Sequence, residues 1–299
     1  MEARRAALLG SGQLMADGQA HTVDTRDEAG EGGTLGSATT APTIARSYLR
    51  ISALHELQYR VNFWLQLVES FVALGTAIAV IALVFANTEA LAGWSLDELL
   101  VVLGVHVALG GVIKAIVQPN MLQLVEDVTQ GDLDFLLLKP AGSLLLASVR
   151  QVAFWKLVDV IVGLGVIAVA IARPGVELSW TGVFGGSLLL VLGAVIVWCF
   201  WVVLTVSSFW IIRADHIVEL FSGLYQAGRW PVSIYPLALR IGFTVIVPLA
   251  FAVTVPAQAV TGRLTFAGLV TALAFTAALL LVTRWAWGRG LRRYDGASA

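Results

Sequence analysis

The sequence predicts an all-α integral membrane protein with six transmembrane helices. Of its 299 residues, 58% are hydrophobic and 13% are charged, whereas soluble domains average about 45–50% apolar and about 25% charged residues. The apolar residues gather in long runs, and most Lys and Arg residues stand between these runs. The net charge of −1 carries no information about nucleic acid, because in a membrane chain the distribution of Lys and Arg is what matters. We expect no nucleic-acid partner.

Residues 1–41 are expected to form a disordered cytoplasmic tail. They are rich in Gly, Ala, Ser, Thr and acids and show no apolar periodicity on which a core could be built. Arg4 and Arg5 are followed by only four apolar residues before Gly10, far fewer than the roughly 7–15 of a signal-peptide core. The tail is therefore predicted to stay in the cytoplasm.

Residues 42–60 are expected to form an amphipathic helix that lies in the membrane interface. Apolar residues recur there at spacings of three and four, while charged residues occupy the other faces. The apolar positions are Ile44, Tyr48, Ile51, Leu54 and Leu57.

Six apolar segments then approach the roughly 20 residues needed to cross about 30 Å of hydrocarbon. The fifth contains Pro248 and Pro256, and proline removes a backbone hydrogen bond and kinks a membrane helix. We therefore expect the fifth helix to be broken. The six segments are 62–86, 97–118, 147–172, 182–212, 236–257 and 265–287.

The basic residues predict that both termini lie in the cytoplasm, because cytoplasmic loops hold an excess of Lys and Arg. With this orientation the outer loops contain only Arg173 and Arg263. The inner side contains Arg46, Arg50, Arg60, Lys139, Arg150, Lys156, Arg213, Arg229, Arg240, Arg284, Arg289, Arg292 and Arg293.

A polar interruption separates the second and third segments. Residues 125–140, VEDVTQGDLDFLLLKP, contain four acids and end in the only Lys-Pro pair of the chain. Two interpretations stand: a cytoplasmic element that transmits force, or a solvated loop whose acids keep it out of the bilayer.

No motif for catalysis is found in the sequence. None of the three lysines, Lys114, Lys139 and Lys156, follows a glycine as the phosphate-binding GxxxxGK[ST] motif requires. There is no nucleophile elbow and no HExxH, and the four histidines are scattered. The single Cys199 allows no disulfide within the chain. We therefore expect no enzymatic activity, no cofactor and no metal in this chain.

Ionisable residues within the apolar segments are costly and often functional. Glu69 and His106 lie deepest, and they could line a translocation path, pair with each other or contact a partner subunit. Lys114 is expected to extend its amine to the inner interface. Lys156 and Asp159 are expected to form an ion pair one turn apart. Residues 213–236, which include Trp230 and Tyr235, are interpreted as a cytoplasmic connection at headgroup level.

Three stretches resemble the membrane subunits of type 2 ABC exporters. They are GDLDFLLLKP at 131–140, RWPVSIYPLALRIGFTVIVPLAFAVTVPAQAVTGR at 229–263 and GRGLRRYDGASA at 288–299. Together they look like the bacterial permease family with a Gly-Asp-Leu-Asp plus Lys-Pro signature, which includes viologen and drug exporters. The resemblance begins near residue 43, so the tail is not part of it.

This resemblance implies a six-helix permease with an interfacial connecting helix before the first span and a cytoplasmic coupling helix in the segment 118–140. It implies two permease protomers, identical or related, and two ABC ATPase subunits on separate chains that bind ATP and Mg. The cargo path would run between the protomers along 99–117 and 241–255. Such a protein would reside in the bacterial cytoplasmic membrane, in contact with lipid, and could serve multidrug efflux.

The predicted function is export of a hydrophobic or amphipathic drug, lipid or secondary metabolite by alternating access. Closure of the ATPase dimer would push on the coupling segment, whose acids face the ATPase and whose Leu133, Phe135, Leu136 and Leu137 anchor it to the permease. The expected coupling residues are Glu126, Asp127, Asp132, Leu133, Asp134, Phe135, Lys139 and Pro140. The candidate residues of the translocation path are Glu69, His106, Pro248 and Pro256.

Two other functions fit the sequence. A proton-coupled secondary transporter could use Glu69, His106 or Lys114, because such proteins also have broken helices and intramembrane ions. A membrane scaffold subunit would move nothing.

Overall fold

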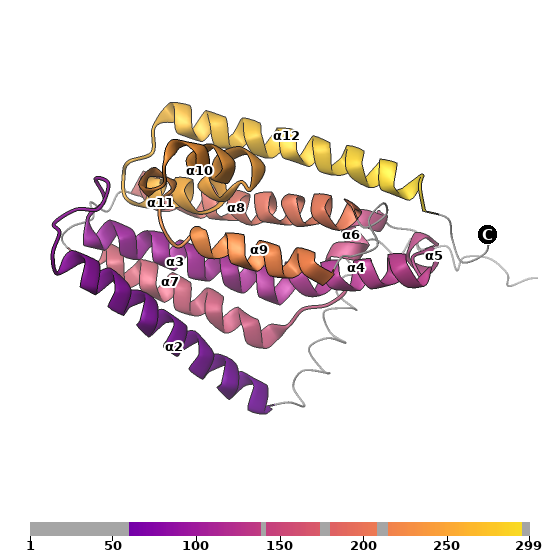
Figure 1. Cartoon of the computed structure of the whole chain (residues 1–299), viewed down its shortest axis with the longest axis horizontal. Coiled ribbons are helices and arrows are strands. Elements are labelled where there is room, and N and C mark those ends of the chain that lie inside the picture. Colours follow the sequence, from indigo (N-terminus) through magenta and orange to yellow (C-terminus); the bar gives the residue numbers. More distant parts are fainter. Residues whose placement is uncertain (1–59, 139–141, 174–179, 208–214, 295–299) are drawn as a thin grey trace, which may run out of the picture. The chain divides into compact units, whose positions relative to one another are not determined.

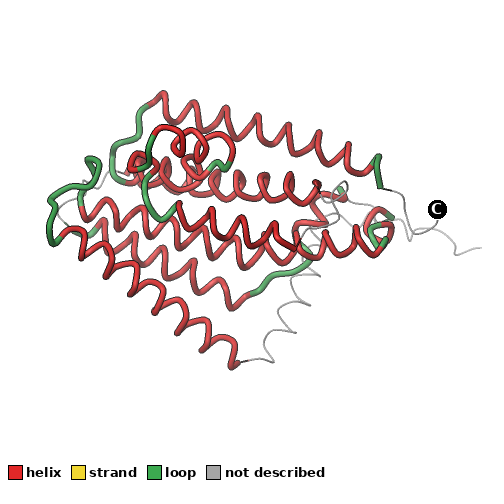
Figure 2. The backbone as a smooth tube through the Cα atoms, viewed as in Figure 1, coloured by secondary structure: helices red, strands yellow, loops and turns green. Residues whose placement is uncertain are grey.

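The computed structural model describes residues 60–138, 142–173, 180–207 and 215–294, and within these ranges the chain forms helices and no strands (Figure 2). The predicted tail 1–41 lies outside the described residues, as does the interfacial helix 42–60 except for Arg60. The longer helices are α2 (Arg60–Phe85), α3 (Leu96–Val112), α4 (Gln118–Gln130), α7 (Leu157–Ile171), α8 (Trp180–Val206), α9 (Asp215–Ala227) and α12 (Phe266–Leu291). The shorter ones are α5 (Asp134–Leu137), α6 (Ser143–Ser148), α10 (Leu237–Ile241) and α11 (Val255–Val260).

Five of the described helices are long and apolar enough to cross a membrane. They are Val61–Phe85, Leu96–Gln130, Phe154–Ile171, Gly182–Val206 and Phe266–Leu291. A sixth candidate is the pair Leu237–Ile246 and Ala250–Val260, which is bent by 80°. The chain is thus a multi-pass, all-helical membrane protein over its described residues.

The helices form a bundle with two distinct ends (Figure 1). We call the end that carries the α2–α3 loop, residues 86–95, the loop end, and the opposite end the α5 end. α7 and α2 pack on one side of α3, and α8 packs against α12 and α11.

The α3–α7 interface is the closest helix contact. A Cβ on Gly163 of α7 would lie 2.3 Å from the backbone nitrogen of Ala108 and 2.6 Å from the carbonyl oxygen of Gly104. Only glycine permits this approach, because real Cβ atoms do not come within 3.0 Å of such atoms. The pairing fixes α7 against the middle of α3.

The second span is longer than a membrane crossing requires. α3, a π-helical turn (η2, Ile113–Val117) and α4 form one helical run of 35 residues, or about 50 Å at 1.5 Å per residue, whereas the hydrocarbon core is about 30 Å thick. Ser95 starts this run with a capping box that includes Glu98. Gly131, at φ 83°, ends it in the left-handed conformation that glycine adopts easily.

The third span is shorter than expected. It begins at Phe154 rather than at 147, and Ser143–Ser148 forms the separate helix α6. Asn120 on α4 explains the break, because it exchanges two hydrogen bonds with the backbone of Gln151, at 2.7 and 2.9 Å. These bonds hold 149–153 outside any helix. Of the expected fourth span, 182–212, residues 208–212 lie outside the described residues.

The expected fifth span, 236–257, is not a single crossing helix. The predicted break is present: Val247 is extended, and Pro248 follows it, as expected for a residue that precedes proline. Both ends of the bent pair are held at the loop end. Before it, Ser233 accepts a hydrogen bond from Trp94 Nε1 at 3.0 Å, and after it, Arg263 donates to the carbonyl of Gly93 at 2.7 Å.

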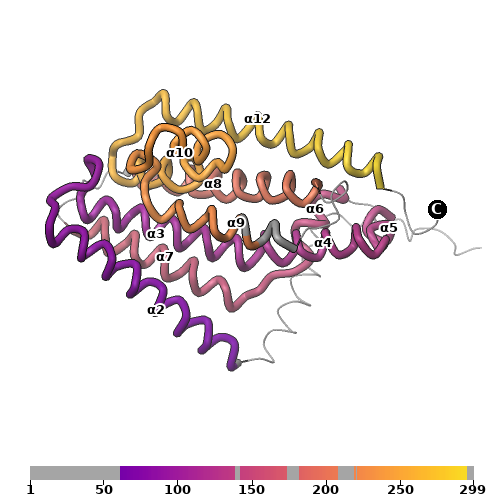
Figure 3. The backbone as a smooth tube through the Cα atoms, viewed as in Figure 1, coloured from indigo at the N-terminus to yellow at the C-terminus, as the bar shows by residue number. Residues whose placement is uncertain are grey.

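α9 occupies the place along the bundle that was expected for the fifth span. The chain leaves α9 toward α10 (Figure 3). Near this end of α9, Tyr225 donates a hydrogen bond to the His106 carbonyl of α3 at 2.6 Å. Residues 215–227, which the sequence analysis interprets as part of a cytoplasmic connection, thus form a helix that packs on α3.

Candidate functional site

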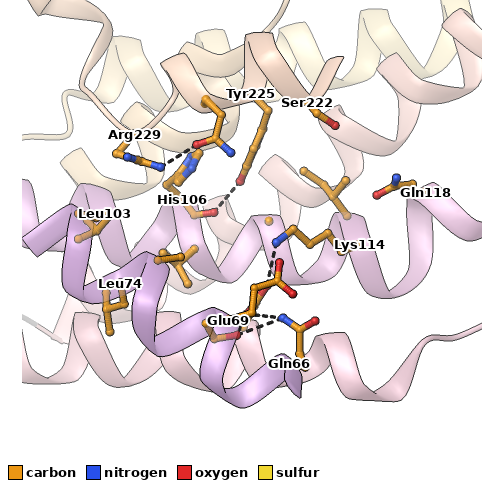
Figure 4. A pocket seen from close by; sticks show the side chains of 18 of the residues that line it. Gln66, Glu69, Leu74, Leu103, His106, Lys114, Gln118, Ser222, Tyr225 and Arg229 are labelled. Atoms are coloured by element: carbon orange, nitrogen blue, oxygen red, sulfur yellow. Dashed lines mark hydrogen bonds and ion pairs between the residues drawn. The ribbon is translucent and has the colours of Figure 1, made fainter. Parts of the chain in front are cut away.

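A cavity of about 160 Å³ lies among α2, the α3–η2–α4 run, α7 and α9 (Figure 4). Its lining combines charged, aromatic and apolar side chains. The polar and aromatic members are Gln66, Glu69, Ser70, His106, Lys114, Gln118, Asp159, Phe221, Ser222, Tyr225, Gln226 and Arg229. Both deep ionisable residues identified from the sequence, Glu69 and His106, line this cavity.

Asp159 is the centre of a buried polar cluster on one wall. Its carboxylate is 3.2 Å from Lys114 Nζ and 3.3 Å from Gln66 Nε2, and it also accepts a hydrogen bond from Ser70. α2 and the α3–η2–α4 run thus contribute three donors to one carboxylate of α7 that is 6% exposed. These bonds offset the cost of placing a charge between apolar helices.

Lys114 and Lys156 do not make the contacts that the sequence analysis expects of them. Lys114 bonds to Asp159 and is half-exposed, rather than extending freely to the interface. Lys156 does not pair with Asp159 one turn away; its amine lies 3.6 Å from Glu69 of α2. Both acids therefore find their cation on another helix, a relation that spacing along one helix cannot reveal.

An aromatic stack from α3 and α9 forms another part of the wall. The rings of His106 and Tyr225 lie parallel with centroids 4.5 Å apart, and Phe221 stacks on Tyr225 at 5.9 Å. His106 therefore packs against α9 and makes no bond to Glu69. Sequence reasoning missed α9, although Phe221 and Tyr225 stand four residues apart, the spacing of one helix face.

Arg229 lies just beyond α9 at the same end of the cavity as His106 (Figure 4). Its Nη2 donates to Gln226 Oε1 at 2.7 Å, and its charge acts on His106. The position is well inside the bundle, because His106 is ten residues, or about 15 Å, from the start of α3. Arg229, which the sequence analysis counts among the basic residues of a cytoplasmic connection, therefore lines the cavity between the helices.

The two prolines proposed for the translocation path do not line this cavity. Pro248 is buried in the bend between the two helices of the bent pair. Pro256 stands in the first turn of α11 and packs inward, a position where proline is compatible with a helix.

The projecting end of the second span carries the expected coupling residues. Leu133 and Leu136 are fully buried and hold α5 against the rest of the chain. Phe135 points away instead of anchoring α5, since it is 71% exposed, and Leu138 is 81% exposed. Glu126 and Asp132 are exposed and Asp134 is half-buried. Lys139 and Pro140 lie outside the described residues.

Asp127 differs from the other acids of this segment. Its carboxylate faces inward, where it pairs with Arg150 and accepts a hydrogen bond from Gln123 at 2.9 Å. The expectation that all four acids face a partner therefore fails for Asp127, whose role is to hold α4 to the segment that precedes the third span.

The end of α12 also touches the coupling element. The hydroxyl of Tyr294 lies against the backbone N–H groups of Leu133 and Asp134 at the start of α5. Its partial burial and the nearby carboxylates of Asp134 and Asp132 raise the pKa of Tyr294. α5 is thus connected to α4 through the chain and to α12 through this phenol.

Comparison with known proteins agrees with this architecture. The family model of the ABC-2 family transporter protein matches residues 71–298. No curated protein and no solved structure matches the chain. The match covers most of the chain, from α2 to beyond α12, and membership implies a partner ATPase component. The chain therefore belongs to the ABC-2 family of transporter proteins, as a transmembrane permease subunit of an ABC transporter.

Proposed function

We propose that this permease exports a hydrophobic or amphipathic substrate across the bacterial cytoplasmic membrane. In this proposal α2, α3, α7, α8, α9 and α12 make the six crossings and the bent pair re-enters from outside. The α5 end is cytoplasmic. Arg289, Arg292 and Arg293, at the end of α12, support that orientation, because basic residues collect on the cytoplasmic side.

One observation carries the proposal: a single helical run joins the cavity to the exposed coupling surface. Leu103, His106 and Lys114 line the cavity, and the same run ends at Gln130, directly before α5. A continuous helix transmits a displacement of α5 to the cavity wall. The π-helical turn at Lys114 is the point where this run departs from α-helical geometry, a feature often found at functional sites.

The energy source in this proposal is a pair of ATPase subunits on separate chains, which bind ATP and Mg. This chain hydrolyses nothing itself. Exposed Phe135 and Leu138 would enter an apolar recess of the ATPase, and Glu126 and Asp132 would meet basic residues at its rim, as in other interfaces with an apolar centre and a polar rim. A second permease, identical or related, would complete the transporter.

Charge reversal at the coupling surface tests this function. Asp132→Lys, and separately Phe135→Ala, should lower co-purification of the ATPase and abolish substrate-stimulated ATP hydrolysis, while the permease remains monodisperse. Glu89→Lys is the matched control, because Glu89 is an exposed acid at the loop end. If both coupling variants retain the ATPase and its stimulation, the proposed coupling role is wrong.

The Lys114–Asp159 pair favours a second candidate, a proton-coupled transporter, because ion pairs within a bundle can serve as proton relays. This candidate predicts transport by the permease alone in liposomes, with a rate that depends on the proton gradient. The export proposal predicts none without the ATPase.

A further inference from the structure

The cavity holds one cation that the described protein does not neutralise. Three of its four charged lining residues are in ion pairs: Lys114 and Asp159 pair with each other, and Glu69 pairs with Lys156. Arg229 bonds only to the neutral amide of Gln226, and no carboxylate in the described ranges pairs with it. With both pairs neutral, the charge left in the cavity is that of Arg229.

The surroundings of Arg229 make this charge unusual. It lies beside His106, about 15 Å along α3 from the loop end. An arginine at such depth is costly and usually has a partner or a function. Two nitrogen atoms of the site are buried and, within the described part of the chain, have no hydrogen-bond partner: Nε of Arg229 and Nδ1 of His106.

The same cavity also offers an apolar surface. Leu74 and Ala77 of α2, Leu103 of α3 and Phe221 of α9 line it together with the stacked rings of His106 and Tyr225. A ligand that satisfies both features needs a negative head group for Arg229 and a hydrocarbon body for these side chains. Guanidinium binds phosphate and carboxylate oxygens in pairs of parallel hydrogen bonds.

We propose that the substrate of this permease is an amphiphile with an anionic phosphate or carboxylate head group, which Arg229 binds within the cavity. The proposal rests on the transport function proposed above and narrows it to one charge class. In this structure the guanidinium of Arg229 donates to the side-chain amide of Gln226. A head group would exchange with this neutral amide at little cost, because a charged acceptor makes the stronger hydrogen bond.

Two photoreactive probes with the same alkyl diazirine chain test the charge preference. One carries a phosphate and the other a trimethylammonium group, and each is titrated onto the permease with its co-purifying ATPase in phosphatidylcholine nanodiscs. Labelling of peptides from α3 and α9 is quantified by mass spectrometry. The alkyl phosphate should label them at a concentration at least about tenfold lower than the cation does, a difference of about 1.4 kcal/mol. Equal labelling, or a preference for the cation, overturns the proposal.

Two substitutions test the role of Arg229 itself. Arg229→Gln should raise the half-saturating concentration of the alkyl phosphate about tenfold. Gln226→Glu keeps the arginine but places a carboxylate on it, so it should cause a similar loss. Arg240→Gln is the matched control, because Arg240 is exposed, bonds to the Ser233 carbonyl and does not line the cavity. Unchanged labelling in both Arg229→Gln and Gln226→Glu overturns the proposal.

Two further arms separate related outcomes. Replacing phosphatidylcholine by phosphatidylglycerol identifies the source of the anionic substrate. If the lipid displaces the probe, the substrate is an anionic lipid of the bilayer. If the probe stays bound, the substrate is an amphiphile that enters from water. Both results support an anion site, because in either case the alkyl phosphate has already bound to the permease in phosphatidylcholine nanodiscs. ATPase co-purification is measured on the same samples, so failure of the transport function with intact labelling would be distinguished from failure of the anion site.

Discussion

At the residue scale, the inward-facing Asp127 provides the first prediction. Its carboxylate pairs with Arg150, and both side chains are largely buried, at 9% and 15% exposure. Asp127→Asn removes the carboxylate of a buried ion pair, and breaking such a pair typically costs about 3–5 kcal/mol. We expect the melting temperature of the detergent-purified permease to fall by several degrees.

Glu126→Gln is the control for this prediction, because the neighbouring Glu126 is exposed and its carboxylate bonds only to the Gln130 side chain among the described residues. A surface change of this kind should alter stability by less than about 0.5 kcal/mol. If Asp127→Asn has the same melting temperature as the control and the parent, the Asp127–Arg150 pair does not contribute to the stability of the permease.

The sequence contained a signal for the orientation of Asp127 that reasoning from charge overlooked. The buried residues of α4 are Asn120, Met121, Leu124 and Asp127, which recur at spacings of one, three and three along a single face. Treating the acids as one group ignored this period. The partners Arg150 and Lys156 could not be assigned in the same way, because each ion pair joins helices that only the fold brings together.

At the element scale, the crossing of α3 and α7 depends on glycine. Gly163→Ala would place a methyl group 2.3 Å from the Ala108 nitrogen and 2.7 Å from its Cα, so the helices must separate. Overpacking of this kind costs about 1–3 kcal/mol, and we expect a lower melting temperature and a lower yield of monodisperse protein.

Gly165→Ala on the same helix is the matched control. No atom lies within 4 Å of the Cβ it would add, and alanine favours a helix over glycine by up to about 1 kcal/mol. This variant should be as stable as the parent or slightly more stable. Equal melting of the two alanine variants would show that the close approach does not limit the packing.

Helix by helix, hydropathy predicted the long spans well and failed where the chain lies inside the bundle. α2, α8 and α12 agree with the predicted segments 62–86, 182–212 and 265–287 within the described residues. α9 has only 13 residues and includes Asp215 and Glu219, so it falls below the length that a hydropathy scan expects. Pro248 correctly predicted the break in the segment 236–257. A proline does not determine the direction of the chain after the bend.

At the scale of the whole molecule, Tyr294 connects the last span to the coupling element. Tyr294→Phe removes the oxygen that faces the amides of Leu133 and Asp134. Losing this contact should accelerate amide exchange of α5, and the stimulation of ATP hydrolysis by substrate should weaken. Tyr235→Phe, which loses a bond to the Ala227 carbonyl at the loop end, should leave α5 exchange unchanged.

This effect should not depend on pH in the physiological range. The pKa of Tyr294 is raised by burial and by the carboxylates of Asp134 and Asp132, above the usual value of about 10. A raised folded-state pKa means that the stabilisation is present below the unfolded pKa and is lost as the pH rises through the folded one. A difference between parent and Tyr294→Phe that changes from pH 6 to pH 9 would contradict this role.

Topology is the level at which the proposal departs most from the sequence analysis, which counts Arg229 and Arg240 as cytoplasmic and the bent pair as a crossing. Single cysteines resolve it, because the native Cys199 is fully buried and gives little background with an impermeant maleimide. Asn87→Cys marks the loop end and Asp132→Cys the α5 end. We expect Pro236→Cys and Thr265→Cys, which flank the bent pair, both to react from the side of Asn87, because Ser233 and Arg263 are bonded to the α2–α3 loop. If the bent pair crossed the membrane, Pro236→Cys would react from the side of Asp132 and Thr265→Cys from the side of Asn87. That pattern would show that α9 is not one of the spans.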